Sequence, residues 1–449
     1  MPKRIIQEVL SIAIAAALFL TGCSTQNQQA VAVSSFSPMR VTAANCNYGG
    51  EFKTIEAVDA YTVRFTLCSP DAALPSKMAS PVLVIQDKDY LDAAHGSSER
   101  MTINTNGTGP YQLLLNIPKS RLELKTSPTY WGIPPMSQFL DFQFLNLPSD
   151  GPSINELATN DATTSFILND SLKTTLRVVD YLNQEKHTPM DLVYLGFNNK
   201  IKPMDNLAVR QALAMVINRS KLVQTYLPYG SLVADQMVPQ GIPSGHTDNL
   251  KWYDLTPGDA HSNLVNAGFD FTQTLTLAYV STPTRYVQNS LLIAKEIQSE
   301  LAAIQIIVTL KPMSQSEFDA AMSSGTEMMF LNSFNALYSD GAAFYELPFI
   351  RQASQFGNPY VEIQQDLQAA QSETTTNGRQ DKFDALNQKF KDLVPLIPIG
   401  NVPEWSFFNK NVTGAAVNGF FENFEDLSNK TNTIRILETN RPLSLWPAD

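Results

Sequence analysis

The strongest constraint on the fold is an alternation of apolar strands with long amphipathic helices in the second half of the chain. Residues 275–280 and 306–310 have the continuous apolar character of buried strands. Between them, apolar side chains recur at helical spacing, at Val287, Leu291, Ala294, Ile297, Leu301 and Ile304. A strand, a long helix and a second strand predict a right-handed crossover between parallel strands. This region is therefore expected to be an α/β domain.

The same rhythm extends over residues 200–410, while residues 45–195 have a different pattern. In the first region we expect helices over residues 318–322 and 381–393 and a strand over residues 328–334. In the second, period-two alternation predicts a half-buried strand over residues 61–67 that pairs with residues 52–57. Residues 111–115 and 121–125 predict a further strand pair. The second region is therefore expected to be mixed and more antiparallel.

Residues 194–219 combine a strand, a turn and a capped helix. A short apolar strand ends in Phe197-Asn198-Asn199, and a turn at Pro203 follows. Either Asp205 or Asn206 is placed to cap the next helix, whose apolar positions are Val209, Leu213, Val216 and Ile217. The pattern by itself is typical of any α/β domain.

The N-terminus resembles an export signal. Lys3 and Arg4 precede an apolar run over residues 12–20, which is too short to span a bilayer but typical of a secretory signal. Leu20-Thr21-Gly22-Cys23 then resembles a lipobox, which predicts a signal peptide over residues 1–22 and lipidation of Cys23. The alternative is an ordinary signal peptide with an incidental cysteine. Residues 23–45 begin with a stretch rich in Gln and Ser. This composition predicts a flexible tether.

Composition and charge exclude several function classes. Lys and Arg number 32 against 43 Asp and Glu, a formal net charge of −11, and no basic cluster occurs. Nucleic-acid binding is therefore not expected, because phosphate contacts need clustered Lys and Arg. The four histidines are scattered, and no metal-ligand spacing, nucleophile elbow or phosphate loop is present. We therefore expect no cofactor, no metal and no enzymatic activity.

The remaining cysteines, Cys46 and Cys68, form an even pair in a chain with an export signal. Such a pair predicts a disulfide. It would close a loop of about 22 residues and stabilise the fold by about 3 kcal/mol through chain entropy. Two free thiols are the alternative.

Several motifs, in order, resemble the solute-binding proteins of peptide and nickel ABC importers (family 5, which includes oligopeptide- and dipeptide-binding proteins). Residues 194–219 resemble their "FN…PF.D.RVRQALA.AIDR" segment. The other matching stretches are Glu56-Ala57-Val58-Asp59 with residues 61–65, Gly107-Thr108-Gly109-Pro110-Tyr111 with Tyr130-Trp131-Gly132, Tyr338-Ser339-Asp340, and Pro395-Leu396-Ile397-Pro398. Each motif is weak alone, but their common order over residues 50–427 is specific.

The resemblance implies an α/β, periplasmic-binding-protein-like (type II) fold with mixed sheets and two lobes around a cleft. It places the first lobe at residues 46–197, the second at residues 198–412, and a return with a C-terminal tail at residues 413–449. One crossing between lobes is expected near Phe197-Asn198 and the other near Val412-Thr413-Gly414. Compared with the family, the region before residue 50 is shortened. Residues 433–437, followed by residues 442–447, resemble the family's opening strand and are expected to fill its position; a disordered tail or a misplaced gene boundary is the alternative.

Strand-end geometry and the resemblance together predict the ligand site, because ligands of parallel α/β sheets lie beyond the carboxyl ends of the strands. The predicted ligand-binding residues are Phe197, Asn198, Ser281, Thr282, Asn335, Leu337, Tyr338, Asp340 and Trp405. Leu337 stands where peptide-binding members carry the aspartate that pairs with the peptide amine, which disfavours a free-amine anchor. The alternatives are that Leu337 and Trp405 are core residues and that Asp340 caps the next helix.

The resemblance implies an exported, lipid-anchored binding protein on the outer face of the cytoplasmic membrane. It would be a monomer that delivers a small solute, such as a peptide, to an ABC permease and ATPase complex by lobe closure. The alternative is a surface lipoprotein with a sensory or adhesive role that keeps the fold without transport. The motifs do not identify the ligand, because binders of peptides, oligosaccharides and metal chelates share them.

Overall fold

The computed structural model describes residues 36–80, 84, 86–95, 97, 101, 105–118, 120–144, 162–166, 182–414 and 424–438. They divide into two compact units at the boundary between Pro70 and Asp71. The predicted signal peptide, Cys23 and most of the predicted tether lie outside the described residues.

The small unit is a three-stranded antiparallel sheet. Its strands, in the order β1-β2-β3, are β1 (Met39–Thr42), β2 (Phe52–Asp59) and β3 (Thr62–Leu67). The predicted hairpin is present, with Asp59 paired to Thr62 so that Ala60 and Tyr61 form the turn. Tyr61 is 94% exposed, so the expectation that it alternates into a half-buried strand is wrong. A turn residue has no neighbouring strand to cover it.

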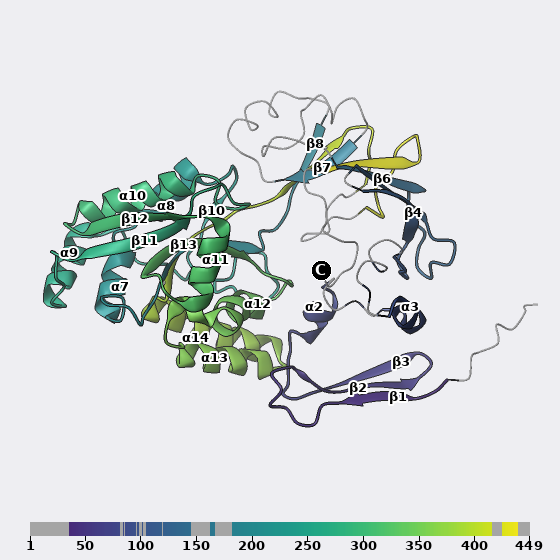
Figure 1. The fold of residues 1–449 in the computed structure, drawn as a ribbon, viewed down its shortest axis with the longest axis horizontal. Helices are drawn as coiled ribbons and strands as arrows, with labels where there is room; N and C mark the ends of the chain where they lie inside the picture. Colours follow the sequence, from purple (N-terminus) through teal and green to yellow (C-terminus); the bar gives the residue numbers. More distant parts are fainter. Residues whose placement is uncertain are drawn as a thin grey trace, which may run out of the picture. The chain divides into compact units, whose positions relative to one another are not determined.

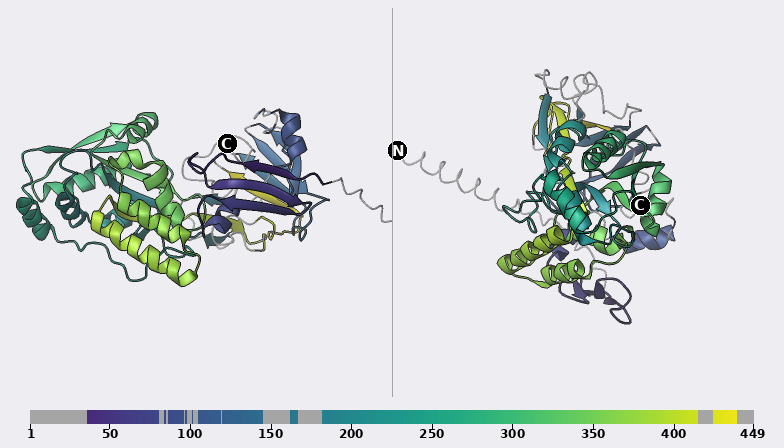
Figure 2. Two further views of the ribbon diagram at one scale, coloured as in Figure 1. Left: turned by 90° about the horizontal axis from the view of Figure 1, so that it is seen from below. Right: turned by 90° about the vertical axis from the view of Figure 1, so that its left-hand side faces the viewer.

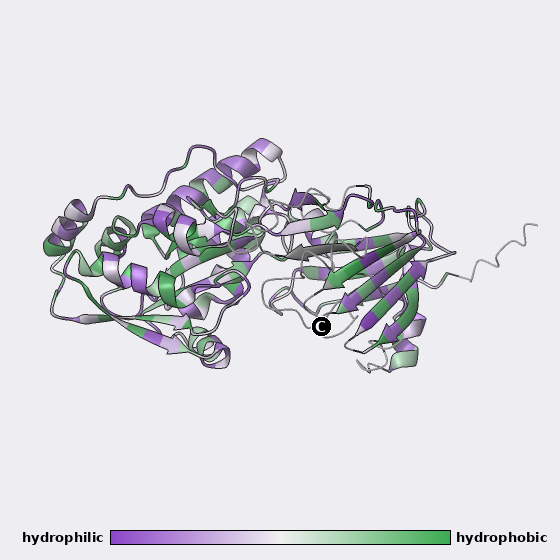
Figure 3. Cartoon of the chain, turned by 90° about the horizontal axis from the view of Figure 1, so that it is seen from above, coloured by the Kyte–Doolittle hydropathy of each residue, from purple (hydrophilic) through white to green (hydrophobic). Residues whose placement is uncertain are grey.

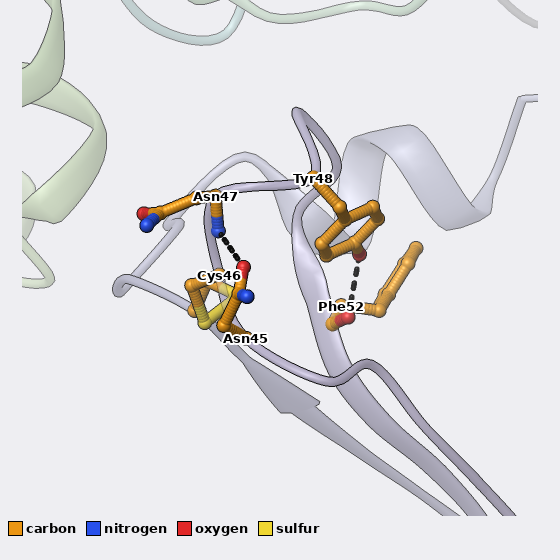
Figure 4. Close-up of a disulfide and its surroundings, with 6 residues drawn as sticks. Asn45, Cys46, Asn47, Tyr48 and Phe52 are labelled. Carbon is orange, nitrogen blue, oxygen red and sulfur yellow. Dashed lines mark hydrogen bonds between the residues drawn. A yellow bond between two sulfur atoms is a disulfide. The ribbon is translucent and has the colours of Figure 1, made fainter.

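One face of this small sheet is apolar, because the pairing stacks side chains in rows across it. Met39 lies opposite Ala57 and Ala57 opposite Val63. No apolar side chain among residues 36–70 falls in the buried class, so the described part of the unit has no core of its own. Cys46 and Cys68 are bonded in the structure, with 2.07 Å between the sulfurs (Figure 4). The bond joins the β1–β2 connection to the end of β3.

The large unit contains a six-stranded sheet in the order β10-β14-β9-β13-β11-β12 (Figure 1). Strands β11, β12 and β13 are parallel, as the predicted crossover requires, and β9 and β10 join through antiparallel pairs. The bounds are β9 (Asp191–Phe197), β10 (Leu232–Val233), β11 (Thr274–Val280), β12 (Ile307–Met313), β13 (Met329–Asn335) and β14 (Leu396–Asn401). The sheet is therefore mixed, as predicted. We call it and its helices the α/β body.

Helices cover both faces of this sheet, with α8 and α10 on one side and α11 on the other (Figure 1). In Figure 3 helices of the large unit carry both hydrophilic and hydrophobic colours, as amphipathic helices do. Figure 2 shows the long helices α13 and α14 side by side. The bounds are α7 (Leu207–Ala214), α8 (Arg219–Tyr226), α9 (Pro257–Asn266), α10 (Ser290–Ala302), α11 (Gln315–Ser324), α12 (Gly341–Glu346), α13 (Val361–Ser372) and α14 (Thr376–Leu393). A π-helical turn (Leu347–Arg351) and a 3₁₀ turn (Ala353–Phe356) follow α12.

Local chemistry explains where these helices begin and end. Of the two candidate caps before α7, Asn206 is the one used, and its side chain accepts a hydrogen bond from the Ala208 N–H. Ser314 and Glu317 form a complete capping box at the start of α11. Gly325 ends that helix in the left-handed conformation, at φ 61°, which favours glycine. The helix predicted from Val287 to Ile304 is shorter in the structure, where α10 runs from Ser290 to Ala302.

The second sheet of the large unit has seven strands in the order β4-β5-β6-β16-β7-β15-β8. The bounds are β4 (Tyr111–Ile117), β5 (Arg121–Thr126), β6 (Phe139–Phe144), β7 (Ala162–Phe166), β8 (Leu182–Lys186), β15 (Trp405–Asn409) and β16 (Thr433–Glu438). β16 lies between β6 and β7 and is parallel to both, so the sequence resembling an opening strand is a central strand. Residues 439–449 lie outside the described residues. Two short helices, α2 (Leu74–Met78) and α3 (Lys88–Ala94), precede this sheet.

The chain crosses between the two sheets at other residues than predicted. β9, with Phe197 at its end, is an inner strand of the six-stranded sheet, so the first crossing precedes Asp191. β15 pairs with β7 and β8, so the second crossing lies at residues 402–404, before Val412. All seven residues of β9 are buried, which fits an inner strand. The expected crossings were inferred from the resemblance, whereas long-range pairing decides which sheet each strand joins.

Candidate functional site

The carboxyl ends of β11 and β13 meet at one edge of the six-stranded sheet. Ser281 and Thr282 follow β11, Asn335 ends β13, and all three are exposed. The antiparallel register places Asn335 opposite Asp191, the first residue of β9. Both chain crossings therefore leave the sheet at this edge, which we call the crossing edge.

Phe197 and Asn198 do not belong to this site. Phe197 pairs with Met329 at the other end of β13, about 20 Å from Asn335 at a rise of about 3.3 Å per residue. Phe197 is fully buried, and Asn198 is a turn residue whose Nδ2 donates to the Gly325 carbonyl at 2.9 Å. The prediction failed because β9 runs antiparallel to β13, so its end points away from the carboxyl ends of the parallel strands.

The loop after β13 directs its side chains alternately outward and inward. Leu337 is 47% exposed, whereas Tyr338 and Asp340 are 6% and 4% exposed. The Tyr338 hydroxyl donates to Glu346 Oε2 at 2.7 Å, and burial with the nearby Glu346 charge raises the pKa of the phenol. Of this loop, Asn335 and Leu337 are the side chains that face solvent at the crossing edge.

Asp340 makes a structural ion pair. Its two oxygens accept hydrogen bonds from Nη1 and Nη2 of Arg379, both at 2.8 Å. Oδ1 also caps α12 by accepting from the Ala342 N–H, and Oδ2 accepts from the Ser244 hydroxyl at 3.0 Å. The predicted role in pairing with a ligand cation is therefore not supported, because the carboxylate already has a buried cation. The alternative prediction, that Asp340 caps the following helix, agrees with the structure.

Trp405 lies at the start of β15, beside the second crossing. Its ring is stacked on Tyr229, with centroids 5.9 Å apart and planes 15° apart. Lys186 Nζ lies 5.9 Å from the Trp405 ring and donates to the Gly230 carbonyl at 3.2 Å. Gly230 has φ +84°, and a Cβ there would lie 3.1 Å from the indole. The indole Nε1 is buried and lacks an acceptor among the described residues.

Polar contacts bind the two crossings to each other and to the loop after β11. The buried carboxylate of Asp191 accepts from the Val402 N–H at 3.0 Å on both oxygens, and burial raises its pKa well above the ordinary range. Asn401 Nδ2 donates to the Asp191 carbonyl at 2.6 Å. Arg285, four residues after Ser281, forms an ion pair with Glu404. This ion pair links the segment after β11, which contains Ser281, to the second crossing, which Trp405 follows directly.

Sequence reasoning missed four residues of this edge: Lys186, Tyr229, Arg285 and Glu404. Glu404 precedes the predicted Trp405, so its position in the chain was a usable signal. Tyr229 precedes a glycine in a Pro-Tyr-Gly turn, which is a weak signal without a structure. The sequence gave no signal for Lys186 and Arg285, because an isolated basic residue is most often a solvated surface group. Burial lowers the pKa of Lys186.

The crossing edge offers groups for non-covalent binding: an aromatic stack, basic side chains, and exposed polar side chains at strand ends. The fold also brings His187 Nε2 within 2.7 Å of Ser406 Oγ, but both residues are buried, so a substrate cannot reach that pair as it stands. Within the described ranges, no group of three His, Cys, Asp or Glu residues could hold a metal ion. A hollow of about 430 Å³ lies elsewhere, between α10 and the start of β12.

Two sheets joined by two adjacent crossings define a class of bilobal binding proteins, and comparison with known proteins identifies the family. Residues 26–355 match the bacterial extracellular solute-binding proteins, family 5 middle region. The chain belongs to this family. No helix within the described ranges has both the length and the apolar character needed to span a membrane.

Individual relatives and solved structures are similar at low identity. The dipeptide-binding protein of Escherichia coli K12 is 23% identical over 382 residues, which cover 83% of this chain and 71% of that protein. HbpA2 of Haemophilus parasuis superimposes with a TM-score of 0.74 at 22% identity, covering 86% and 76% of the two chains. A dipeptide-binding protein of Pseudoalteromonas sp. SM9913 in complex with Met-Leu gives 0.68 at 21% identity, covering 85% and 76%. These are type II periplasmic binding proteins, so the predicted fold class is confirmed.

Proposed function

We propose that this protein is an extracytoplasmic solute-binding lipoprotein that delivers a peptide or a similar small solute to an ABC importer. The family carries this proposal, and the two adjacent crossings support it because they allow the sheets to move as lobes. Binding is non-covalent and occurs at the crossing edge, where the half-buried Trp405 supplies part of its ring and the exposed Ser281, Thr282 and Asn335 supply polar groups. The protein acts as a monomer, without a cofactor or enzymatic activity.

The solute is not anchored through a free α-amine at Asp340, because Arg379 neutralises that carboxylate. Leu337, which stands at the amine-pairing position of peptide-binding members, offers no charge either. An N-blocked peptide or a neutral solute such as an oligosaccharide fits the edge better, since a buried ammonium without a partner is costly.

Mass spectrometry of solutes that co-purify with protein expressed without residues 1–22 identifies the ligand. Calorimetry with that solute then compares Trp405→Ala with Trp131→Ala, a matched change at a tryptophan that is 83% exposed in the connection between β5 and β6. We expect the first variant to bind at least tenfold more weakly and the second to bind like the wild type. Equal affinities in all three proteins would exclude Trp405 from the site.

Lipidation of Cys23 is part of the proposal and is tested separately. A fatty-acid analogue should label the wild-type protein but not Cys23→Ala, which should also leave the membrane fraction. Continued labelling of the variant contradicts the anchor. The alternative function, a surface lipoprotein without transport, predicts that no permease and ATPase genes adjoin this gene.

A further inference from the structure

The large unit begins with a short segment, residues 71–80, that contains α2 and a buried lysine. We call this segment the strap. Lys77 is only 5% exposed, which is unusual for a lysine, and its presence therefore requires charged partners. Figure 1 shows α2 beside α12, which follows the loop after β13.

Two carboxylates and an aromatic ring enclose the Lys77 ammonium. Nζ lies 2.7 Å from Asp71 Oδ2 within the strap and 2.9 Å from Glu346 Oε1 at the end of α12. It also lies 5.4 Å from the centre of the Tyr338 ring. Glu346 in turn accepts the Tyr338 hydroxyl on its other oxygen and the Gln371 side chain on the first. One cation therefore organises a buried group drawn from the strap, the loop, α12 and α13.

The strap also binds main-chain groups at both of its ends. The Ser80 hydroxyl donates to the Leu337 carbonyl at 2.9 Å, and the Ala72 N–H donates to the Gln371 carbonyl at 2.8 Å. The loop after β13 is thus held at two consecutive residues, at the main chain of Leu337 and the side chain of Tyr338. Drawing Tyr338 inward leaves Leu337 directed outward at the crossing edge, because neighbouring side chains of an extended segment point to opposite sides.

We propose that Lys77 is a positioning residue for the solute site: through the strap it fixes the loop of residues 336–339 in the conformation that presents Asn335 and Leu337 at the crossing edge. The inference rests on the proposed function for the role of that edge, but the loop geometry stands without it. Without the ammonium, Asp71 and Glu346 are left as buried carboxylates that share no cation, and the group that retains Tyr338 loses its central charge.

Hydrogen exchange tests the loop geometry without any solute. Ala336 N–H donates to the Met190 carbonyl and Asp340 N–H to the Tyr338 carbonyl, so these amides report on the two ends of the loop. In Lys77→Met, which keeps the aliphatic stem, both should exchange at least tenfold faster while β11 and β14 keep their protection. Lys88→Met is the matched control, because Lys88 forms an exposed pair with Asp92 on α3. Lys77→Arg should restore protection to within about threefold of the wild type.

Unchanged exchange at Ala336 and Asp340 in Lys77→Met overturns the proposal, and so does an equal increase throughout the α/β body. If Lys77→Met does not fold, Ser80→Ala serves instead, since it removes only the hydroxyl that holds the Leu337 carbonyl. The role in binding is measured with an N-blocked dipeptide, N-acetyl-Met-Leu, and with the co-purified solute. Weaker binding by Lys77→Met than by Lys88→Met supports positioning, and equal affinity despite faster exchange overturns it. A wild-type protein that binds no solute refutes the proposed function, while the exchange result still decides the loop geometry.

Discussion

At the scale of single residues, Glu300 on α10 is the carboxylate whose environment most directly predicts a pH effect. Its Oε2 accepts the Asn218 N–H at 3.0 Å, and burial raises its pKa from 4.5 to about 7. Because the folded-state pKa lies above the unfolded-state value, stability is lost as the pH rises from about 4.5 to 7. The protonated side chain is the one that the fold favours.

We therefore expect Glu300→Gln to stabilise the protein at pH 8 by about 1–2 kcal/mol, a figure reduced for the partial exposure of the group. At pH 4 the two proteins should unfold alike. Urea unfolding at both pH values measures the difference, with the exposed Glu362→Gln on α13 as the matched control. A gain that is the same at pH 4 and pH 8 would contradict the titration argument.

The Asp340–Arg379 pair predicts a large effect on stability. Removing one partner leaves the other as an unpaired buried charge, so Asp340→Asn should reduce the free energy of unfolding by about 3–5 kcal/mol. Arg379→Met should do the same, and the double variant should recover part of the loss. Denaturant titration of the three variants checks this. If Asp340→Asn is as stable as the wild type and only solute affinity falls, the carboxylate is a ligand group after all.

At the scale of elements, we expect the stability of the seven-stranded sheet to depend strongly on its central strand, β16. It separates β6 from β7, and Ile434 and Ile436 are fully buried. A chain that ends at residue 432 should lose these contacts and melt appreciably lower, since each buried Ile contributes about 2–5 kcal/mol relative to Ala. A chain that ends at residue 438 is the control, because it keeps β16. Identical melting curves for the two truncations would show that the strand is dispensable.

At the scale of the whole molecule, the two units should differ in what stabilises them. The α/β body has a large apolar core, whereas no apolar side chain of residues 36–70 is buried. The Cys46–Cys68 bond closes a 22-residue separation, worth about 3 kcal/mol in the chain-entropy model. The small unit should therefore depend on the bond more than the large unit does.

Limited proteolysis with and without reductant tests this dependence. Reduction, or Cys46→Ser with Cys68→Ser, should accelerate cleavage within residues 36–70 and leave the protection of the α/β body unchanged. Intact-mass measurement after alkylation shows whether the bond forms in exported protein. Two alkylated thiols without reductant, or equal proteolysis of both forms, would contradict the prediction.

Local features of the sequence were sufficient to predict much of the fold. Periodicity located β11, α10 and β12, whose parallel pairing follows from the long connection between them. Residues 111–115 and 121–125 were recognised as paired strands from their pattern, whereas residues 433–437 were expected to form a strand only because they resemble the family's opening strand. Ser281, Thr282 and Asn335 were found at the crossing edge because strand ends can be read from the chain, whereas Trp405 was chosen because it lies near the return crossing that the resemblance implies.

The tertiary structure alone decided the direction of each strand in its sheet, the partner of each charged side chain, and which of these charges are buried. Phe197 was assigned to the site because its strand was recognised without its antiparallel orientation, which only the register with β13 shows. Asp340 looked available because its partner Arg379 lies 39 residues later, on α14. Lys77 gave no signal, because its two carboxylates come from residues 6 and 269 positions away. Local propensity acts over a few residues and is present in the sequence itself, whereas the burial of a charge depends on which distant segments the folded chain brings around it.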